Sequence, residues 1–142
     1  MSLAAREGAE VSLVRDASVA AGLLLPDETP PAHLAASIDA ATGRLHAPWL
    51  LWAELRNVLL LAERRRRLPE GAAEAFLPLA DRLDFAFDTA PDSAAVLRLA
   101  RAHRLSAYDA LYLELALRRR ATLATLDAAL RQAAGAEGVP LV

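Results

Sequence analysis

Four acidic residues have the type and placement that metal-ion chemistry requires: Asp16, Glu54, Asp109 and Asp127. Asp16 and Asp127 each follow directly on a short apolar run that predicts a β-strand. Ligands of open α/β sheets bind beyond the carboxyl ends of the strands. If these two strands are neighbours, we expect the two carboxylates to lie close together.

Three of these acids also have a purely local explanation. Asp16 and Asp127 are each suited to cap the helix that follows. Ser106 and Asp109 have the spacing of a capping box, in which both residues satisfy the first turn of a helix. Local structure and a shared acidic pocket therefore both remain open for these residues.

Glu54 is harder to explain as part of local structure. On a helix its neighbours three and four positions away are Leu50, Leu51, Asn57 and Val58, none of which is a cation. A carboxylate on an apolar stripe is costly unless it is paired, protonated or bound to a metal ion. The alternative is a helix edge where Glu54 reaches water.

The basic residues narrow the chemistry, because all 16 are arginine. Without lysine, a P-loop, a Schiff base and a response-regulator receiver site are excluded. Carboxylates about 5 Å apart repel by roughly 3 kcal/mol per pair at an effective dielectric near 20, and no lysine can neutralise them. Oxygen-rich carboxylate sites suit Mg²⁺ or Mn²⁺, so a divalent ion is the expected counter-charge.

Composition limits the class of protein further. Hydrophobic residues make up 55% of the 142 residues, too many for a disordered chain, and the absence of cysteine excludes disulfides and thiolate metal sites. No apolar run is long enough to span a membrane, and residues 1–10 are too polar for a signal peptide, so we expect a cytoplasmic protein. The formal charge of -2 does not favour nucleic-acid binding unless bound cations reverse it locally.

The elements that must position the acids alternate along the chain. The sequence predicts strands over 11–15, 45–47, 85–87, 122–125 and 139–142, and helices over 17–25, 32–41, 48–66, 69–83, 91–103, 107–119 and 128–134. This alternation favours a helix-rich α/β fold with a short-stranded, mostly parallel sheet. We expect one domain over 11–142 and a flexible leader over 1–10.

Four segments carry a family resemblance. They are Val14-Arg15-Asp16-Ala17-Ser18, Ala47-Pro48-Trp49 with Glu54 and Asn57, Leu105-Ser106-Ala107-Tyr108-Asp109-Ala110-Leu111-Tyr112, and Thr125-Leu126-Asp127. In this order and spacing they resemble the successive motifs of a PIN-domain ribonuclease of the VapC type, the toxin of a VapBC toxin–antitoxin system. Arg15 departs from the family pattern, which has an apolar residue there, and would either pair with Asp16 or point to solvent.

The resemblance implies a three-layer α/β/α sandwich in which Asp16, Glu54, Asp109 and Asp127 form an acidic quartet. It implies an endoribonuclease that hydrolyses RNA with Mg²⁺ or Mn²⁺, with a cognate antitoxin and a homodimer as its protein assemblies. Ser18, Asn57 and Thr125 are candidates for orienting the carboxylates or metal-bound water. The three histidines, His33, His46 and His103, show no obvious partners and are expected to be peripheral.

Other features leave alternatives open. The arginine runs 64–67 and 118–120 lie at expected helix C-termini, where they either interact with the helix dipole or contact phosphates. Trp49, Trp52 and the leucines that follow are mostly core, with a surplus for a dimer surface or an antitoxin groove. A haloacid-dehalogenase-like phosphatase is disfavoured because Ser18 stands where its second Asp is needed. A non-catalytic PIN-like module that binds RNA or protein remains an alternative function.

Overall fold

The computed structural model describes residues 12–29, 31–33 and 45–142. Within these ranges the strands are β1 (Leu13–Arg15), β2 (Leu45–Pro48), β3 (Phe85–Asp88) and β4 (Thr122–Ala124). The helices are α1 (Ala17–Leu24), α3 (Leu50–Arg64), α4 (Ala73–Arg82), α5 (Ser93–His103), α6 (Ala107–Arg119) and α7 (Ala128–Ala136). The predicted alternation of strands and helices is confirmed.

The described strands form one parallel sheet in the order β3-β2-β1-β4. β1 is central, and its Val14 lies opposite His46 of β2 and Leu123 of β4. The carboxyl ends of β1 and β4 are therefore adjacent. This register brings the residues that follow these two strands, Asp16 and the segment leading to Asp127, to one edge of the sheet.

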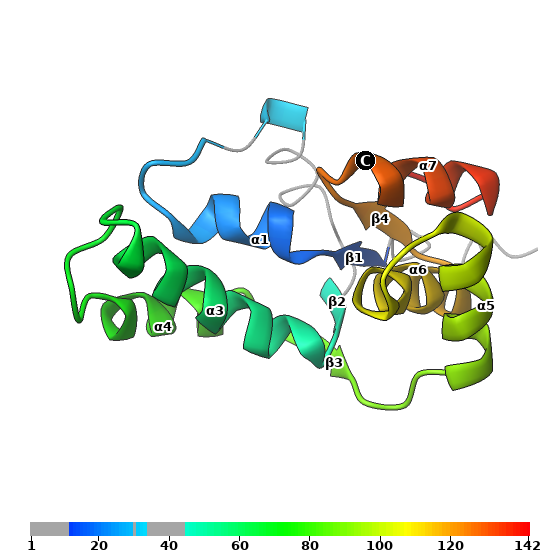
Figure 1. Cartoon of the computed structure of the whole chain (residues 1–142), viewed down its shortest axis with the longest axis horizontal. Coiled ribbons are helices and arrows are strands. Elements are labelled where there is room, and N and C mark those ends of the chain that lie inside the picture. The colour runs from blue at the N-terminus through cyan, green and yellow to red at the C-terminus, as the bar shows by residue number, and fades with distance from the viewer. Residues whose placement is uncertain (1–11, 30, 34–44) are drawn as a thin grey trace, which may run out of the picture.

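Helices lie on both sides of the sheet, which gives the expected three-layer arrangement. Figure 1 shows α1, α3 and α4 grouped at one side and α5, α6 and α7 at the other. α6 packs across β1, β2 and β4, and α5 packs on α6. The main core is formed by apolar side chains from both sides, among them Val14, Leu51, Leu99, Leu113 and Leu123. No helix in the described part of the chain is long and apolar enough to cross a membrane.

Several predicted boundaries were wrong. The helix expected over 69–83 begins only at Ala73, because Pro69 starts a turn in which Gly71 adopts a positive φ of 79°. The strand expected over 139–142 is reduced to one bridge between Leu141 and Leu123. The leader over 1–10, residue 11 of the first strand and most of the helix expected over 32–41 lie outside the described residues.

Both predictions for Arg15 were wrong. Its side chain is fully buried, and in the described structure its Nε, Nη1 and Nη2 atoms have no hydrogen-bond partner. Burial lowers the pKa of this guanidinium to about 10. The physical reason is position: β1 has neighbouring strands on both edges and helices over the sheet, so a side chain from its last residue does not reach water.

Candidate acidic active site

Three helices begin at the acidic residues. Asp16 caps α1 by accepting the backbone N–H of Val19 at 3.2 Å, and Asp127 caps α7 by accepting that of Leu130 at 2.8 Å. Ser106 caps α6 by accepting the N–H of Asp109 at 3.1 Å, which places Asp109 in the first turn. The local explanations are thus correct, and they coexist with clustering. Helix N-termini carry partial positive charge, which offsets part of the carboxylate charge.

Two hydroxyl groups hold the Asp16 carboxylate. Ser18 Oγ donates to Oδ1 at 2.6 Å, and Thr125 Oγ1 donates to Oδ2. Each hydroxyl is itself oriented by a backbone N–H, because Ser18 Oγ accepts from Leu126 at 3.0 Å and Thr125 Oγ1 accepts from Asp127 at 3.0 Å. Thr125, directly after β4, and Ser18 of α1 therefore fix the orientation of an acid at the end of β1.

Glu54 is held by a residue that the sequence reasoning missed. Tyr112 of α6 donates its hydroxyl to Glu54 Oε1 at 2.5 Å, and Tyr112 is buried. A signal was available, since Tyr112 lies three residues after Asp109 and so on a neighbouring part of the same helix face. The contact joins α3 to α6 across 58 residues of sequence.

The four carboxyl groups interact electrostatically. Burial, then the charges of Asp16 and Asp109, raises the pKa of Glu54, while the Tyr112 hydrogen bond opposes the rise. Burial, Asp127 and Asp16 raise the pKa of Asp109, against a lowering contribution from Ser106. Burial raises the pKa of Asp16 despite its hydrogen bonds, and Asp127 adds to the rise. We call Asp16, Glu54, Asp109 and Asp127 the acidic cluster.

Within the described part of the chain, the acidic cluster has no protein counter-ion. Among the ion pairs of the described residues, none includes any of its four members. Hard carboxylate oxygens are the donors that Mg²⁺ and Mn²⁺ prefer, so the donor chemistry fits such an ion. Within residues 12–29, 31–33 and 45–142, however, no three such side chains lie close enough together to hold a single ion as they stand.

Other predicted site residues lie outside the cluster. Asn57 is exposed on α3 and makes no hydrogen bond to the cluster within the described chain. His33 is exposed, His46 is buried in β2, and His103 Nε2 lies 2.9 Å from Glu137. The expectation that the histidines lack partners was therefore wrong for His103, and His46 is not at the periphery.

Two arginines of the runs 64–67 and 118–120 are engaged in ion pairs. Arg118 binds Asp88 through two hydrogen bonds of 3.0 and 2.7 Å and also binds Glu114 at 2.7 Å. Arg67 binds Asp27 at 2.8 Å and Glu28 at 2.9 Å. These two guanidinium groups tie elements of the fold together, which neither alternative for the arginine runs anticipated.

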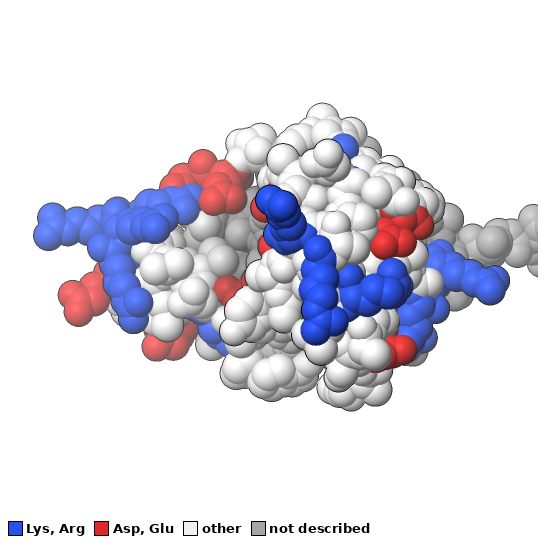
Figure 2. Space-filling view, turned by 45° about the vertical axis from the view of Figure 1, so that its right-hand side comes forward, with Lys and Arg blue, Asp and Glu red and all other residues white. Residues whose placement is uncertain are grey.

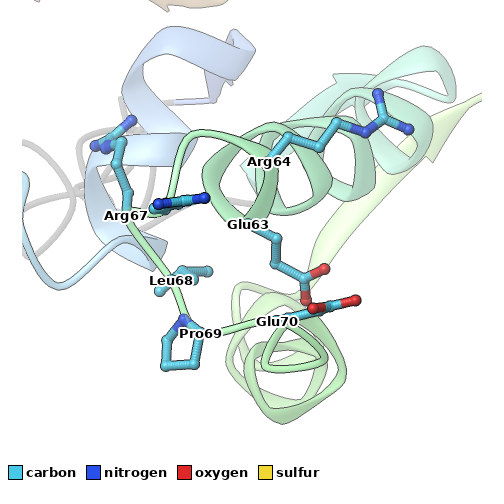
Figure 3. A pocket seen from close by; sticks show the side chains of 7 residues that line it. Glu63, Arg64, Arg67, Leu68, Pro69 and Glu70 are labelled. Carbon is cyan, nitrogen blue, oxygen red and sulfur yellow. The ribbon is translucent and has the colours of Figure 1, made fainter.

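A cavity of about 650 Å³ lies at the other end of α3 from Glu54. It is lined by Glu63, Arg64, Arg66, Arg67, Leu68, Pro69 and Glu70. In the view of Figure 3 the Glu63 side chain is directed toward the Glu70 side of the cavity, and the Arg64 side chain is directed away from it. Ten residues of helix, roughly 15 Å, separate Arg64 from Glu54. This cavity is therefore distinct from the acidic cluster, and its mixed charges do not form an anion site.

The charged surface has the same mixed character on the face seen in Figure 2. Arginine side chains lie there in separate groups, with acidic side chains between them and a broad uncharged area. On this face the arginine side chains do not form one continuous basic surface. Nucleic-acid binding here would therefore need contacts other than arginine alone.

Comparison with known proteins places these features in a family context. The family model described as PIN domain matches residues 13–136. The structure of PAE2754 from Pyrobaculum aerophilum has 27% identity and a TM-score of 0.69, with 93% of this chain and 91% of that chain covered. FitAcB from Neisseria gonorrhoeae has 21% identity and a TM-score of 0.62, covering 91% and 95%.

A third structure, of FitAB bound to an IR36 DNA fragment, has 20% identity and a TM-score of 0.65 over 92% of this chain and 93% of that one. No curated protein sequence matches the chain. At these identities the FitAcB and FitAB structures show a shared fold.

Proposed function

The chain belongs to the PIN domain family, and from this we propose that it is a metal-dependent endoribonuclease of the VapC type. The observation that carries the proposal is the acidic cluster, in which burial and neighbouring carboxylates raise the pKa of Asp16, Glu54 and Asp109 and no described cation forms an ion pair with them. Such an arrangement stores repulsion that a divalent ion would relieve. The substrate is RNA, and the reaction is hydrolysis of a phosphodiester bond.

In this proposal Asp16, Glu54, Asp109 and Asp127 hold Mg²⁺ or Mn²⁺. When bound, such an ion supplies charge for the scissile phosphate and lowers the pKa of a water molecule. Ser18 and Thr125 keep the two oxygens of Asp16 in a fixed orientation. Tyr112 holds Glu54 against the cluster in the same manner. Side chains that bind metal ions are usually oriented by hydrogen bonds of this kind from neighbouring residues.

A protein partner belongs to the same proposal. The FitAcB and FitAB structures share this fold, and we infer for this chain an antitoxin partner and a homodimer. Support comes from the β3 edge of the sheet, where Phe87 of β3 and Trp52 of α3 are exposed apolar side chains that line one hollow. An edge strand with exposed aromatic residues is suited to pairing with another chain.

The experiment that tests the function is RNA cleavage by Asp16→Asn and Asp109→Asn variants. Each should lower the rate by more than about a hundredfold, because the ion loses charge compensation worth several kcal/mol. The matched control is Asp92→Asn, which changes another helix-capping carboxylate, at the start of α5, outside the cluster. EDTA should stop cleavage by the parent, and Mg²⁺ or Mn²⁺ should restore it.

Two outcomes would contradict the proposal. Full activity of both cluster variants would refute the role of the carboxylates. A parent that binds single-stranded RNA but never cleaves it, with either ion, would favour the non-catalytic PIN-like module. Circular dichroism spectra of all variants show whether a loss of activity reflects unfolding.

A further inference from the structure

Three exposed apolar side chains lie close in sequence to members of the acidic cluster. Tyr108 is 64% exposed and precedes Asp109, and Leu126 is 47% exposed and precedes Asp127. Trp49 is 54% exposed and lies where β2 leads into α3, five residues before Glu54. Exposed apolar residues gathered at one place mark a binding surface more often than scattered ones do.

A groove of about 370 Å³ continues this apolar rim. Its apolar walls are Pro48, Trp49, Leu50, Pro91 and Leu111. Leu50 lies one helical turn before Glu54, and Leu111 lies one turn after Tyr108, so each shares a helix face with a residue of the rim or the cluster. The groove is thus bounded by the first turn of α3, which leads into Glu54, and by the part of α6 from Leu111 to Glu114, which includes Tyr112.

Trp49 is a rigid wall of this groove. Its ring stacks on that of Trp52, with ring centroids 5.9 Å apart and an angle of 14° between the planes. The Arg56 guanidinium carbon lies 3.9 Å from the Trp52 ring centroid, and Arg56 Nη1 donates to the Trp52 carbonyl at 3.1 Å. Neighbouring flat groups along α3 thus hold the Trp49 ring in place, while more than half of the residue stays exposed.

We propose that Trp49 with its groove and Tyr108 are stacking sites for unpaired nucleobases of the RNA that flanks the cleaved bond. This rests on the proposed ribonuclease function. A nucleobase is flat, mostly apolar on its faces and able to stack on any aromatic ring, which gives binding with little sequence preference. Unpaired bases are the parts of RNA that proteins bind by stacking on aromatic side chains.

The polar lining of the groove favours a base over a phosphate. Asp88, Thr89 and Glu114 line it, and the two carboxylates share one guanidinium, Arg118. Two negative charges and one positive charge leave the groove net negative, which repels phosphate. Carboxylate oxygens accept hydrogen bonds from the amino groups of bases, as Asp and Glu accept from cytosine.

The test is binding of a single-stranded RNA decamer by fluorescence anisotropy, in Mg²⁺ and in an Asp16→Asn background that cannot cleave it. Trp49→Ala and Tyr108→Ala should each weaken binding about five- to a hundredfold, the range that loss of one stacked base produces. Trp49→Phe should recover most of the affinity because it restores a ring. Leu97→Ala is the matched control, since Leu97 is exposed on α5, a helix that contributes no member of the acidic cluster.

A second probe separates bases from backbone. A decamer with abasic sugars at the central positions keeps its phosphates but lacks the bases that would stack. The parent and Trp49→Ala should therefore bind this decamer with the same affinity. A duplex of the same length should bind the parent and both variants equally weakly. If Trp49→Ala binds the abasic decamer more weakly than the parent does, Trp49 acts on the backbone and not on bases, which overturns the proposal.

The remaining outcomes are distinguishable. If the parent cleaves RNA while both variants bind the normal decamer as well as it does, stacking is refuted and the nuclease function stands. If the variants keep RNA affinity but light scattering shows that they have lost association present in the parent, the surface binds protein instead. A parent that neither binds nor cleaves RNA refutes the function and the stacking sites together.

Discussion

Two groups of carboxylates in this molecule contrast in their partners. Asp88 and Glu114 surround the Arg118 guanidinium, whose hydrogen bonds lower the pKa of Asp88. Among the described residues, Asp16 and Glu54 are held by hydroxyl groups and a backbone N–H without a cation, and burial raises their pKa. Helix α6 contributes to both groups, with Asp109 in its first turn and Glu114 and Arg118 further along.

The difference shows what each group is suited to do. Where the chain supplies a cation, the carboxylates join β3 to α6 and contribute to stability. Where the chain supplies only neutral donors, the carboxylates keep a negative charge that is not neutralised within the described structure. The second arrangement disfavours the folded state, so its presence supports a role that needs an external cation.

Removing Arg118 from between Asp88 and Glu114 should have the largest effect on stability. Arg118→Met leaves Asp88 and Glu114 without their cation, and removing one partner of a buried ion pair costs about 3–5 kcal/mol. Arg118 is partly exposed, so we expect the lower end of this range in urea denaturation. Arg119→Met, an exposed neighbour, is the control and should change stability by less than about 0.5 kcal/mol. If Arg118→Met and Arg119→Met lower stability equally, the ion pairs of Arg118 do not stabilise the fold, and the contrast between the two groups of carboxylates is refuted.

Adding Mg²⁺ should have the next largest effect on stability, because it supplies a cation to the acidic cluster. Mg²⁺ at a hundred times its dissociation constant should stabilise the parent by about 2.7 kcal/mol, because it binds the folded site and not the unfolded chain. Thermal melting with EDTA and with Mg²⁺ measures this. Asp16→Asn should lose most of the shift, whereas Asp92→Asn should keep it. A parent that melts identically in both conditions would contradict the metal site.

Neutralising one member of the acidic cluster should have a smaller and opposite effect. In EDTA, Asp109→Asn should be more stable than the parent by on the order of 1 kcal/mol, after allowing for solvent screening. Loss of a carboxylate from the first turn of α6 opposes this by about 0.5–1 kcal/mol. Thermal melting in EDTA decides between the two effects. A variant that melts lower than the parent would mean that Asp109 serves mainly to cap its helix.

The smallest expected effect is the pH dependence of the stability difference between the parent and Asp109→Asn. A carboxyl group whose folded pKa is raised favours folding below its unfolded pKa, about 4, and loses that contribution as pH rises through the folded pKa. In EDTA the advantage of Asp109→Asn should therefore be absent near pH 4 and grow toward pH 7. For Asp88, whose pKa is lowered, the stabilising contribution is present above about pH 4 and lost as pH falls.

Urea denaturation at several pH values measures both trends. The excess stability of the parent over Arg118→Met should shrink as the solution is made more acidic. Parallel curves for the parent and Asp109→Asn from pH 4 to pH 7 would show that Asp109 does not interact with the other carboxylates.

Much of the fold was predictable because its signals are local. Short apolar runs ending in Asp16 and Asp127, and proline and serine at helix starts, placed most elements within a few residues. The four acids stood out for the same reason, since their types and positions relative to strand ends are properties of the sequence. Helix capping by Asp16 and Asp127 was likewise a local prediction, and it is confirmed.

The tertiary structure alone decided which groups meet. The contact of Tyr112 with Glu54 spans 58 residues, and that of Thr125 with Asp16 spans 109, distances over which sequence pattern carries no pairing information. Arg15 is next to Asp16 in sequence, yet the central place of β1 buries it without an ion pair to any described residue, whereas Arg118 pairs with Asp88 across 30 residues. Whether a charge is paired depends on the packing of distant elements, because burial and distance together set its energy.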